Sequence, residues 1–282
     1  SRCGSVYAMK LNGNHIVSAA QDNQHSGQSL IVAWDLTSGL EIRTYESHQG
    51  VIKGLAFDET TIISCSDNQT MKIWNHDCEE TAALLRTFKG HTGGLNSIAM
   101  DDTHILSGSD DYSMKLWDRE SRALLHSFEG HASSVTAVAM DSSSFFSGAS
   151  DNTIKAWSRT NFELETTIAI DDGTVYCLAV DASYIVGGTS NYLVNVWDRA
   201  TYELLRSCTG HSSYVWSVAI DDSSILSGSY DRTVKLWNKV SGEEIRTYEG
   251  HGNYVTSVSM NTTRVVSGSQ DGTVKVWNKE SG

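Results

Sequence analysis

Proline is absent from this 282-residue sequence, although average usage of about 5% would give roughly 14 prolines. Proline-rich linkers and proline-rich ligand motifs are therefore excluded. No hydrophobic run approaches the ~18 residues that a membrane-spanning helix needs. Basic residues are also scarce, with 21 Lys and Arg against 34 Asp and Glu, which gives a net charge of −13. Because nucleic acid and anionic membranes require a positive surface, we expect neither as the main partner.

Cysteine pairs and catalytic motifs are missing as well. The five cysteines form no C-x-x-C pair, and Cys65, Cys177 and Cys208 lie in apolar stretches where a free thiol behaves as a small hydrophobic side chain. This pattern is typical of a reducing intracellular compartment, either cytoplasmic or nuclear. The sequence has no phosphate-binding loop, dinucleotide fingerprint, zinc-protease helix, nucleophile elbow or Cys/His metal spacing. We therefore expect no cofactor, no metal and no catalytic residue.

The sequence does contain an internal repeat. Seven tryptophans follow one another at intervals of 40, 43, 40, 40, 40 and 40 residues, namely Trp34, Trp74, Trp117, Trp157, Trp197, Trp237 and Trp277. Five of the units also share a histidine 26 residues before the tryptophan and a serine 10 residues before it. Each unit contains four short alternating or apolar runs, separated by turn clusters such as Asp221-Asp222-Ser223. Four-stranded units that repeat every ~40–45 residues indicate a β-propeller, in which each unit forms one blade.

Units with Gly-His before the first strand and Trp-Asp at the end of the third resemble the WD-repeat family over about residues 5–280. This resemblance implies an all-β, seven-bladed β-propeller of four-stranded antiparallel blades, forming a single domain over residues 1–282. The blades are expected at about 5–46, 47–89, 90–129, 130–169, 170–209, 210–249 and 250–282. The outer strand of the last blade is missing from this chain, and an unpaired strand edge tends to bind other strands. We therefore expect the native protein to continue upstream and to carry additional domains.

The repeated polar residues are interpreted as structural, because a catalytic group occurs once in a chain and not in every repeat. In the resembled family, the His, Ser, Asp and Trp of a blade form a hydrogen-bonded chain, and buried polar groups need such partners. Four blades keep all members: His91, Ser107, Asp111 and Trp117; His131, Ser147, Asp151 and Trp157; His211, Ser227, Asp231 and Trp237; His251, Ser267, Asp271 and Trp277.

Three blades depart from this pattern. Blade two has Asn68 in place of the aspartate, and blade one has Arg2 near the histidine position. Blade five has Asp171, Gly187 and Asn191 in place of the histidine, serine and aspartate. We therefore expect blades one and five to be the least stable. Asp171 is either an ordinary turn residue or part of a site on blade five.

A lysine two residues before the tryptophan recurs in five blades, as Lys72, Lys115, Lys155, Lys235 and Lys275. These lysines alternate with apolar neighbours along the strand. We interpret them as the solvated side of one strand rather than as a basic binding patch.

Residues at one end of the propeller are not fixed by the repeated structural pattern, so their identities can indicate function. In the resembled family, the loop before the first strand and the loop between the second and third strands meet at this top rim, where partner contacts concentrate. The aromatic residues at these positions come from blades five, six, seven and one: Tyr7, Tyr176, Tyr214, Trp216, Tyr230 and Tyr254. Asp67 and Asp110 fall on the opposite arc, and Lys53 is the only basic residue at the compared positions.

We predict a non-catalytic scaffold that binds a protein or peptide on the top rim, because clustered Tyr and Trp residues anchor protein interfaces. None of the compared rim positions is arginine, which disfavours phosphopeptides as partners. Aromatic residues facing two acids instead suit a peptide with Arg or Lys side chains.

Three alternatives stay open. The aromatic residues only cap the core at the channel mouth; the propeller recognises substrates for a larger assembly, such as a ubiquitin-ligase adaptor or a kinase-linked protein; or an enzyme uses Asp67 and Asp110.

Overall fold

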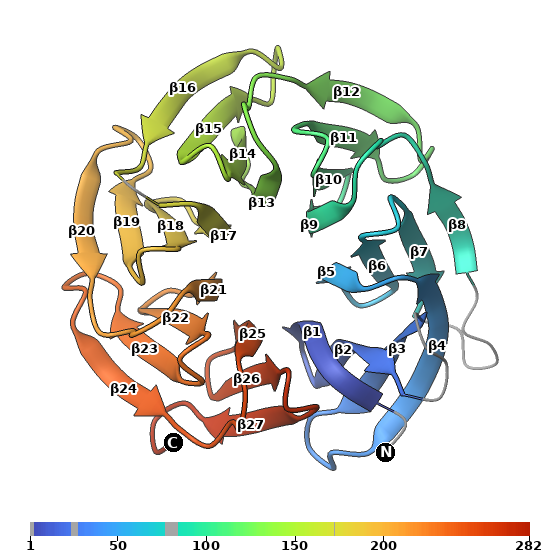
Figure 1. Cartoon of the computed structure of the whole chain (residues 1–282), viewed down its shortest axis with the longest axis vertical. Coiled ribbons are helices and arrows are strands. Elements are labelled where there is room, and N and C mark those ends of the chain that lie inside the picture. Colours follow the sequence, from blue (N-terminus) through green and yellow to red (C-terminus); the bar gives the residue numbers. More distant parts are fainter. Residues whose placement is uncertain (1–2, 24–27, 77–83, 172) are drawn as a thin grey trace.

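The computed structural model describes residues 3–23, 28–76, 84–171 and 173–282. Within them the chain folds into seven antiparallel sheets that stand side by side around a central axis (Figure 1). Six of these sheets have four strands and the seventh has three, and the described residues include no helix. Accordingly, no helix long and apolar enough to cross a membrane is found in these ranges. The β-propeller expected from the repeat is confirmed, and among the described residues blade seven lacks an outer strand, as expected.

The strands follow the repeat blade by blade. Blade one contains β1 (Cys3–Asn12), β2 (His15–Asp22), β3 (Gln28–Asp35) and β4 (Glu41–Gln49). Blade two contains β5 (Ile52–Phe57), β6 (Thr61–Ser66), β7 (Met71–Asn75) and β8 (Leu84–Phe88). Blade three contains β9 (Leu95–Met100), β10 (His104–Ser109), β11 (Met114–Asp118) and β12 (Leu124–Phe128). Blade four contains β13 (Val135–Met140), β14 (Ser144–Ala149), β15 (Thr153–Ser158) and β16 (Leu164–Ala169). Blade five contains β17 (Val175–Val180), β18 (Tyr184–Thr189), β19 (Val194–Asp198) and β20 (Leu204–Cys208). Blade six contains β21 (Val215–Ile220), β22 (Ser224–Ser229), β23 (Val234–Asn238) and β24 (Glu244–Tyr248). Blade seven contains β25 (Val255–Met260), β26 (Arg264–Ser269) and β27 (Val274–Asn278).

Each blade runs outward in chain order, so its first strand is innermost and its fourth lies on the circumference (Figure 1). Second strands such as β14 and β22 are buried along their whole length, because neighbouring blades cover both faces of the sheet. Fourth strands are half exposed: β24 begins with the exposed Glu244 and Ile245 and ends with the buried Tyr248. The hydrophobic core is therefore divided into layers between consecutive blades.

Ring contacts join consecutive blades across these layers. An aromatic residue on the fourth strand packs on the tryptophan of the next blade, with ring centroids 5.2–5.9 Å apart. The pairs are Tyr45–Trp74, Phe88–Trp117, Phe128–Trp157 and Tyr248–Trp277. Trp197 and Trp237 instead pack with the smaller Ile168 and Cys208. Each aromatic pair contributes about 0.5–1.5 kcal/mol beyond the area that it buries.

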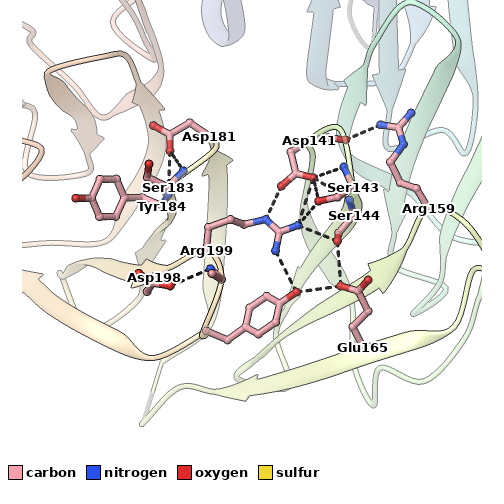
Figure 2. Close-up of polar contacts among 12 residues, drawn as sticks. Asp141, Ser143, Ser144, Arg159, Glu165, Asp181, Ser183, Tyr184, Asp198 and Arg199 are labelled. Carbon is pink, nitrogen blue, oxygen red and sulfur yellow. Dashed lines mark hydrogen bonds and ion pairs between the residues drawn. The ribbon is translucent and has the colours of Figure 1, made fainter.

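Ion pairs join the blades at the end of the propeller opposite the top rim. An aspartate after the first strand pairs with a base that follows the third strand of the next blade: Asp58–Arg119, Asp101–Arg159, Asp141–Arg199, Asp181–Lys239 and Asp221–Lys279. Figure 2 shows Arg199 between blades four and five, where its guanidinium donates to the Asp141 carboxylate and to the Ser144 hydroxyl. Between blades seven and one, the two positions are Asn261 and Leu36, so the series of ion pairs stops there.

Inside blades three, four, six and seven, four side chains form the same hydrogen-bonded network. In blade six, His211 Nδ1 lies 2.7 Å from Asp231 Oδ2, and His211 Nε2 lies 2.7 Å from Ser227 Oγ. The Trp237 indole N–H donates to Ser227 Oγ at 2.8 Å. The corresponding distances in blades three, four and seven are 2.8–2.9 Å. A network of this kind holds the tryptophan ring in a single orientation.

The lysine row differs from the sequence expectation. Lys115 and Lys235 are only 9% exposed, and their ammonium groups donate to Ser127 Oγ and Thr247 Oγ1, each at 2.7 Å. The expectation of a solvated face is wrong for these two residues. Each lysine shares a strand face with the tryptophan two residues further on, and that face packs against the neighbouring blade.

The network of blade two lacks its carboxylate. His48 Nδ1 lies 3.1 Å from Thr70 Oγ1, and Asn68 stands where the other blades have aspartate. Burial, and then the ammonium of Lys72, lower the pKa of His48 to about 3. A histidine that is neutral when folded stabilises the native state above the unfolded pKa of ~6.5. That stabilisation is lost as the pH falls from there towards the folded-state pKa.

We expect Asn68→Asp to reduce the pH dependence of stability. The new carboxylate stabilises the protonated ring, so the folded-state pKa of His48 rises and less stability is lost on acidification. The measurement is thermal unfolding between about pH 7.5 and about pH 4.5, where the Tm of the wild type should fall more steeply. Asn23→Asp, at an exposed position, controls for the added charge. Parallel curves for the wild type and N68D would contradict this account of His48.

Candidate functional site: an aromatic arc at the channel mouth

The seven innermost strands surround a cavity of about 220 Å³ on the propeller axis. Each strand places one side chain at its mouth: Tyr7, Lys53, Asn96, Thr136, Tyr176, Trp216 and Thr256. Where this residue is Asn or Thr, its side chain donates to a backbone carbonyl of the next blade, as Thr256 does to Val6 at 2.7 Å. Tyr176 and Trp216 replace that linking residue in blades five and six, which leaves their rings available at the mouth.

Six aromatic side chains from blades five, six and seven adjoin one another at this end of the propeller. We call them the aromatic arc: Tyr176, Tyr192, Tyr214, Trp216, Tyr230 and Tyr254. Two of them lie in the innermost strands β17 and β21, and the others lie in the loops before β21 and β25 and after β18 and β22. Backbone hydrogen bonds join these loops, since Tyr230 N–H donates to the Tyr214 carbonyl at 3.0 Å.

Four rings of the arc form a continuous stack. The Tyr254 and Tyr230 centroids lie 4.3 Å apart, with 12° between the ring planes. The Tyr230 and Trp216 centroids lie 4.9 Å apart at 19°, and those of Trp216 and Tyr176 lie 4.6 Å apart at 31°. Rings in such contact hold one another in place. The stack is therefore a preformed apolar platform that spans three blades.

Tyr214 connects the stack to the solvent-facing part of the arc. Its ring contacts Tyr176 and Tyr230 on one side and Tyr192 on the other, with centroids 5.7–6.1 Å apart. Tyr192, Tyr214 and Tyr254 are 42%, 39% and 39% exposed. Large aromatic side chains that are exposed together are typical of protein-binding surfaces.

The arc carries no charge of its own. Burial, together with the neighbouring phenols of Tyr176, Tyr254 and Tyr7, raises the pKa of Tyr230 to about 12. Burial also raises the pKa of Tyr176. Both phenols therefore stay protonated at physiological pH. Tyr7, which lines the channel mouth, is a neighbour of the arc at the junction between blades seven and one.

Asp67 and Asp110 lie on blades two and three, and both are exposed. Asp67 Oδ1 accepts from the Val51 N–H at 2.8 Å, and Asp110 Oδ1 accepts from Asn96 Nδ2 at 2.7 Å. A Cβ on Gly94 would stand 3.1 Å from Asp110 Oδ2 and 3.2 Å from Asp67 Cα. The glycine thus allows the two acidic turns to approach each other. In the part of the chain that the structure describes, no group of His, Cys, Asp and Glu side chains is arranged to hold a metal ion.

Tyr192 is the member of the arc that sequence analysis missed. The turn after β18 holds it at φ 72°, a region that costs a bulky residue about 1–2 kcal/mol. Tyr112 occupies the same turn position in blade three, at φ 70° and 48% exposed. The signal that could have found Tyr192 is a bulky residue at a turn position that favours glycine or asparagine.

We expect Tyr192→Asn and Tyr112→Asn to stabilise the protein to a similar extent. Asparagine tolerates positive φ, so each change should add up to about 1 kcal/mol and raise the Tm by about 2–4 °C. Tyr192→Asn alone removes a ring of the arc and should weaken partner binding. Thermal unfolding and a binding assay on both variants check this. Loss of binding in the Tyr112 variant as well would show that Tyr192 has no special part in the site.

Comparisons with known proteins agree with this architecture. A family model of the WD domain, G-beta repeat (WD40), matches residues 39–75, 82–118, 122–158, 202–238 and 242–278. The stretches outside these matches include β1–β3 and β17–β19, from the blades that depart most from the network. The DDB1- and CUL4-associated factor 13 of Dictyostelium discoideum is 33% identical over 69 residues, which is 24% of this chain and 14% of that protein.

Two solved structures superpose on nearly the whole chain. The WD40 β-propeller domain of Doa1 has a TM-score of 0.87 at 22% identity, covering 100% of this chain and 95% of that one. The computationally designed Ika8 protein has a TM-score of 0.77 at 28% identity, covering 99% of this chain and 97% of that one. Because the repeat model matches more than half of the sequence and the fold is a seven-bladed propeller, the chain belongs to the WD40 (WD domain, G-beta repeat) family.

Proposed function

We propose that this protein is a non-catalytic scaffold that binds a protein or peptide at the aromatic arc. WD40 propellers typically serve as protein-interaction scaffolds, which supports the class of function. The observation that carries the proposal is the preformed ring stack, whose end member Tyr254 stays exposed together with the adjoining Tyr192 and Tyr214. Rings that are already held in place lose little conformational entropy on binding, so they are effective anchors.

The chemistry around the arc favours a partner with Arg or Lys side chains. The faces of Trp and Tyr rings attract cations, and the arc itself is uncharged. Asp67 and Asp110, on the other side of the mouth, can pair with a second basic side chain. The net charge of −13 adds a long-range attraction for a basic partner. A bound peptide would therefore cross the channel mouth from the arc towards the two acids.

The alternative that these aromatic residues only cap the core is less favoured by the geometry. A cap is stabilised by burying its rings. Tyr192, Tyr214 and Tyr254 instead stay 42%, 39% and 39% exposed. Rings that a cap would bury therefore stay available to a partner.

A second candidate function is substrate recognition within a ubiquitin ligase. The observation that favours it is the partial match to a DDB1- and CUL4-associated factor. In that case the arc would hold the substrate and another face of the propeller would contact the ligase. Binding of purified DDB1 to the intact chain, in the presence of an arc variant that no longer binds its partner, would support this second function.

We expect the double substitution Trp216→Ala/Tyr230→Ala to weaken partner binding at least tenfold. Aromatic anchors at an interface centre contribute about 2 kcal/mol or more each, and 1.4 kcal/mol corresponds to a factor of ~10. The partner is first captured from a lysate with the intact chain, and its Kd is then measured for variants of matched Tm. Tyr112→Ala, which removes an exposed tyrosine of blade three, is the control. An unchanged Kd in the double variant would refute binding at the arc.

We also expect Asp67→Asn/Asp110→Asn to weaken binding several-fold and to flatten its salt dependence. Asparagine keeps the Oδ1 acceptors of both turns but removes the charges that attract a basic partner. Asp102→Asn/Asp222→Asn is the matched control, because both residues are exposed in turns at the other end of the propeller. Titration calorimetry at low and high salt gives the two slopes. Equal slopes in the two double variants would exclude a basic partner at the mouth.

A further inference from the structure

In several blades, a lysine of the third strand donates its ammonium group to a hydroxyl of the fourth strand. The pairs are Lys115–Ser127, Lys155–Thr167 and Lys235–Thr247, at 2.7–3.0 Å. The Lys235 ammonium also lies 5.9 Å from the centroid of the Trp237 ring. Each of these blades thus contains an ammonium site at a fourth-strand hydroxyl, which the chain fills with its own lysine. In blade six, the Glu244 carboxylate, 2.7 Å from the ammonium, and the Trp237 face also belong to the site.

Blade five keeps the hydroxyl of this site but lacks the lysine. Ser207 is paired in register with Asn195, as Ser127 is paired with Lys115. Asn195 is 5% exposed, and its Oδ1 accepts no hydrogen bond from the described residues. A buried amide oxygen without a donor costs about 1–3 kcal/mol. Asn195 therefore lacks a donor at the position that a lysine occupies in the other blades.

A pocket of about 400 Å³ opens at this place, between the outer parts of blades four and five. Its wall includes Asn195, Ser207, Trp197, Leu204, Ile168 and Asp171. The network histidine, which is buried in other blades, is replaced here by the exposed Asp171, and the network serine is replaced by Gly187. Both changes take side-chain volume out of the blade. Ligand pockets commonly have volumes of about 300–1,000 Å³, so this one can hold a small ligand or a long side chain.

The charge at the pocket rim also differs from that in the other blades. In blade three, burial lowers the pKa of His91, Asp111 opposes this shift, and the Lys115 ammonium adds to it. The Lys115 ammonium therefore lies close enough to the His91 ring to disfavour its protonated form. In blade five the bordering residue is Asp171, whose carboxylate attracts a cation.

We propose that the blade-five pocket binds a primary alkylammonium group, in the place that a lysine of the chain fills elsewhere. The ammonium donates to Ser207 Oγ and Asn195 Oδ1, and Asp171 balances its charge. A half-turn of the Asn195 amide brings its oxygen towards the pocket. The alkyl chain lies along Leu204, and the indole face of Trp197 adds a cation–π contact.

Two kinds of molecule carry this chemistry, namely the lysine side chain of a polypeptide and a free diamine. Asn191 and Leu193, which flank Tyr192 of the arc in sequence, line the pocket, but no residue of the arc does. The inference therefore does not depend on the proposed function. Either one can therefore fail without the other.

The test is a titration of the full chain, followed through the indole N–H signal of Trp197 in a proton–nitrogen correlation spectrum. The probes are Nα-acetyl-lysine N-methylamide, cadaverine and Nα-acetyl-norleucine N-methylamide, the last of which has no ammonium group. We expect a saturable shift with an amine and none with the norleucine derivative. Tighter binding of the lysine derivative assigns the site to a polypeptide, and tighter binding of cadaverine assigns it to a free diamine. No shift with either amine, or an equal shift with norleucine, would overturn the proposal.

Asn195→Lys supplies the ammonium from within the chain. It should abolish the titration shift and raise the Tm. Asp171→Asn, at an exposed position, should weaken amine binding several-fold and decides the question if the lysine variant does not fold. Wild-type affinity in both variants would contradict the proposed site.

Lys155→Asn is the matched control in blade four. It removes the corresponding lysine but keeps His131 and Ser147 in place. Because the histidine still fills the blade and no carboxylate replaces it, this variant should show no saturable shift at Trp157. Amine binding there would mean that loss of the lysine alone creates the site, and that Asp171 has no part in it.

Discussion

The tryptophan of each third strand is the residue on which the propeller depends. In every blade except blade five, which has Gly187 in place of the serine, its indole N–H donates to a serine hydroxyl, as that of Trp277 does to Ser267 at 2.9 Å. In blades two to seven, its ring also packs against the fourth strand of the preceding blade, as Trp277 does against Tyr248. The same side chain therefore takes part both in the hydrogen-bonded network inside a blade and in the packing between blades. Because many similar interfaces share the stability, a single blade can depart from the pattern without loss of the fold.

Several departures from the repeated pattern lie where binding is proposed. Blades three, four and seven have an Asn or Thr that links the channel wall, whereas blades five and six present Tyr176 and Trp216 at that position. Blade five also lacks the network histidine and the inward-facing lysine, which opens the pocket beside Trp197. Residues released from a structural contact lower local stability but become available for contacts with a partner. The arc and the pocket both follow from this exchange.

The fold and the rim positions could be predicted because both follow from the period of the repeat. Strand spacing decides which loop a residue occupies, so Trp216 and Tyr230 could be assigned to the same end of the propeller. The position of Tyr192 in the arc could not be predicted, since its contact with Tyr214 crosses from blade five to blade six. The burial of Lys115 was missed for the same reason. Alternation along a strand shows which face a side chain takes, but not whether another sheet covers that face.

By itself, the sequence determined the number of blades, the strands in each blade and the polar residues that recur in register. These are properties of local spacing, and they repeat often enough to be read from one chain. Only the tertiary structure decided which side chains from different blades meet: the stack from Tyr254 to Tyr176, the two acidic turns beside Gly94 and the pocket at Asn195. Such contacts depend on the angle between neighbouring sheets and on the reach of each side chain across the interface. Spacing along the chain does not encode either quantity.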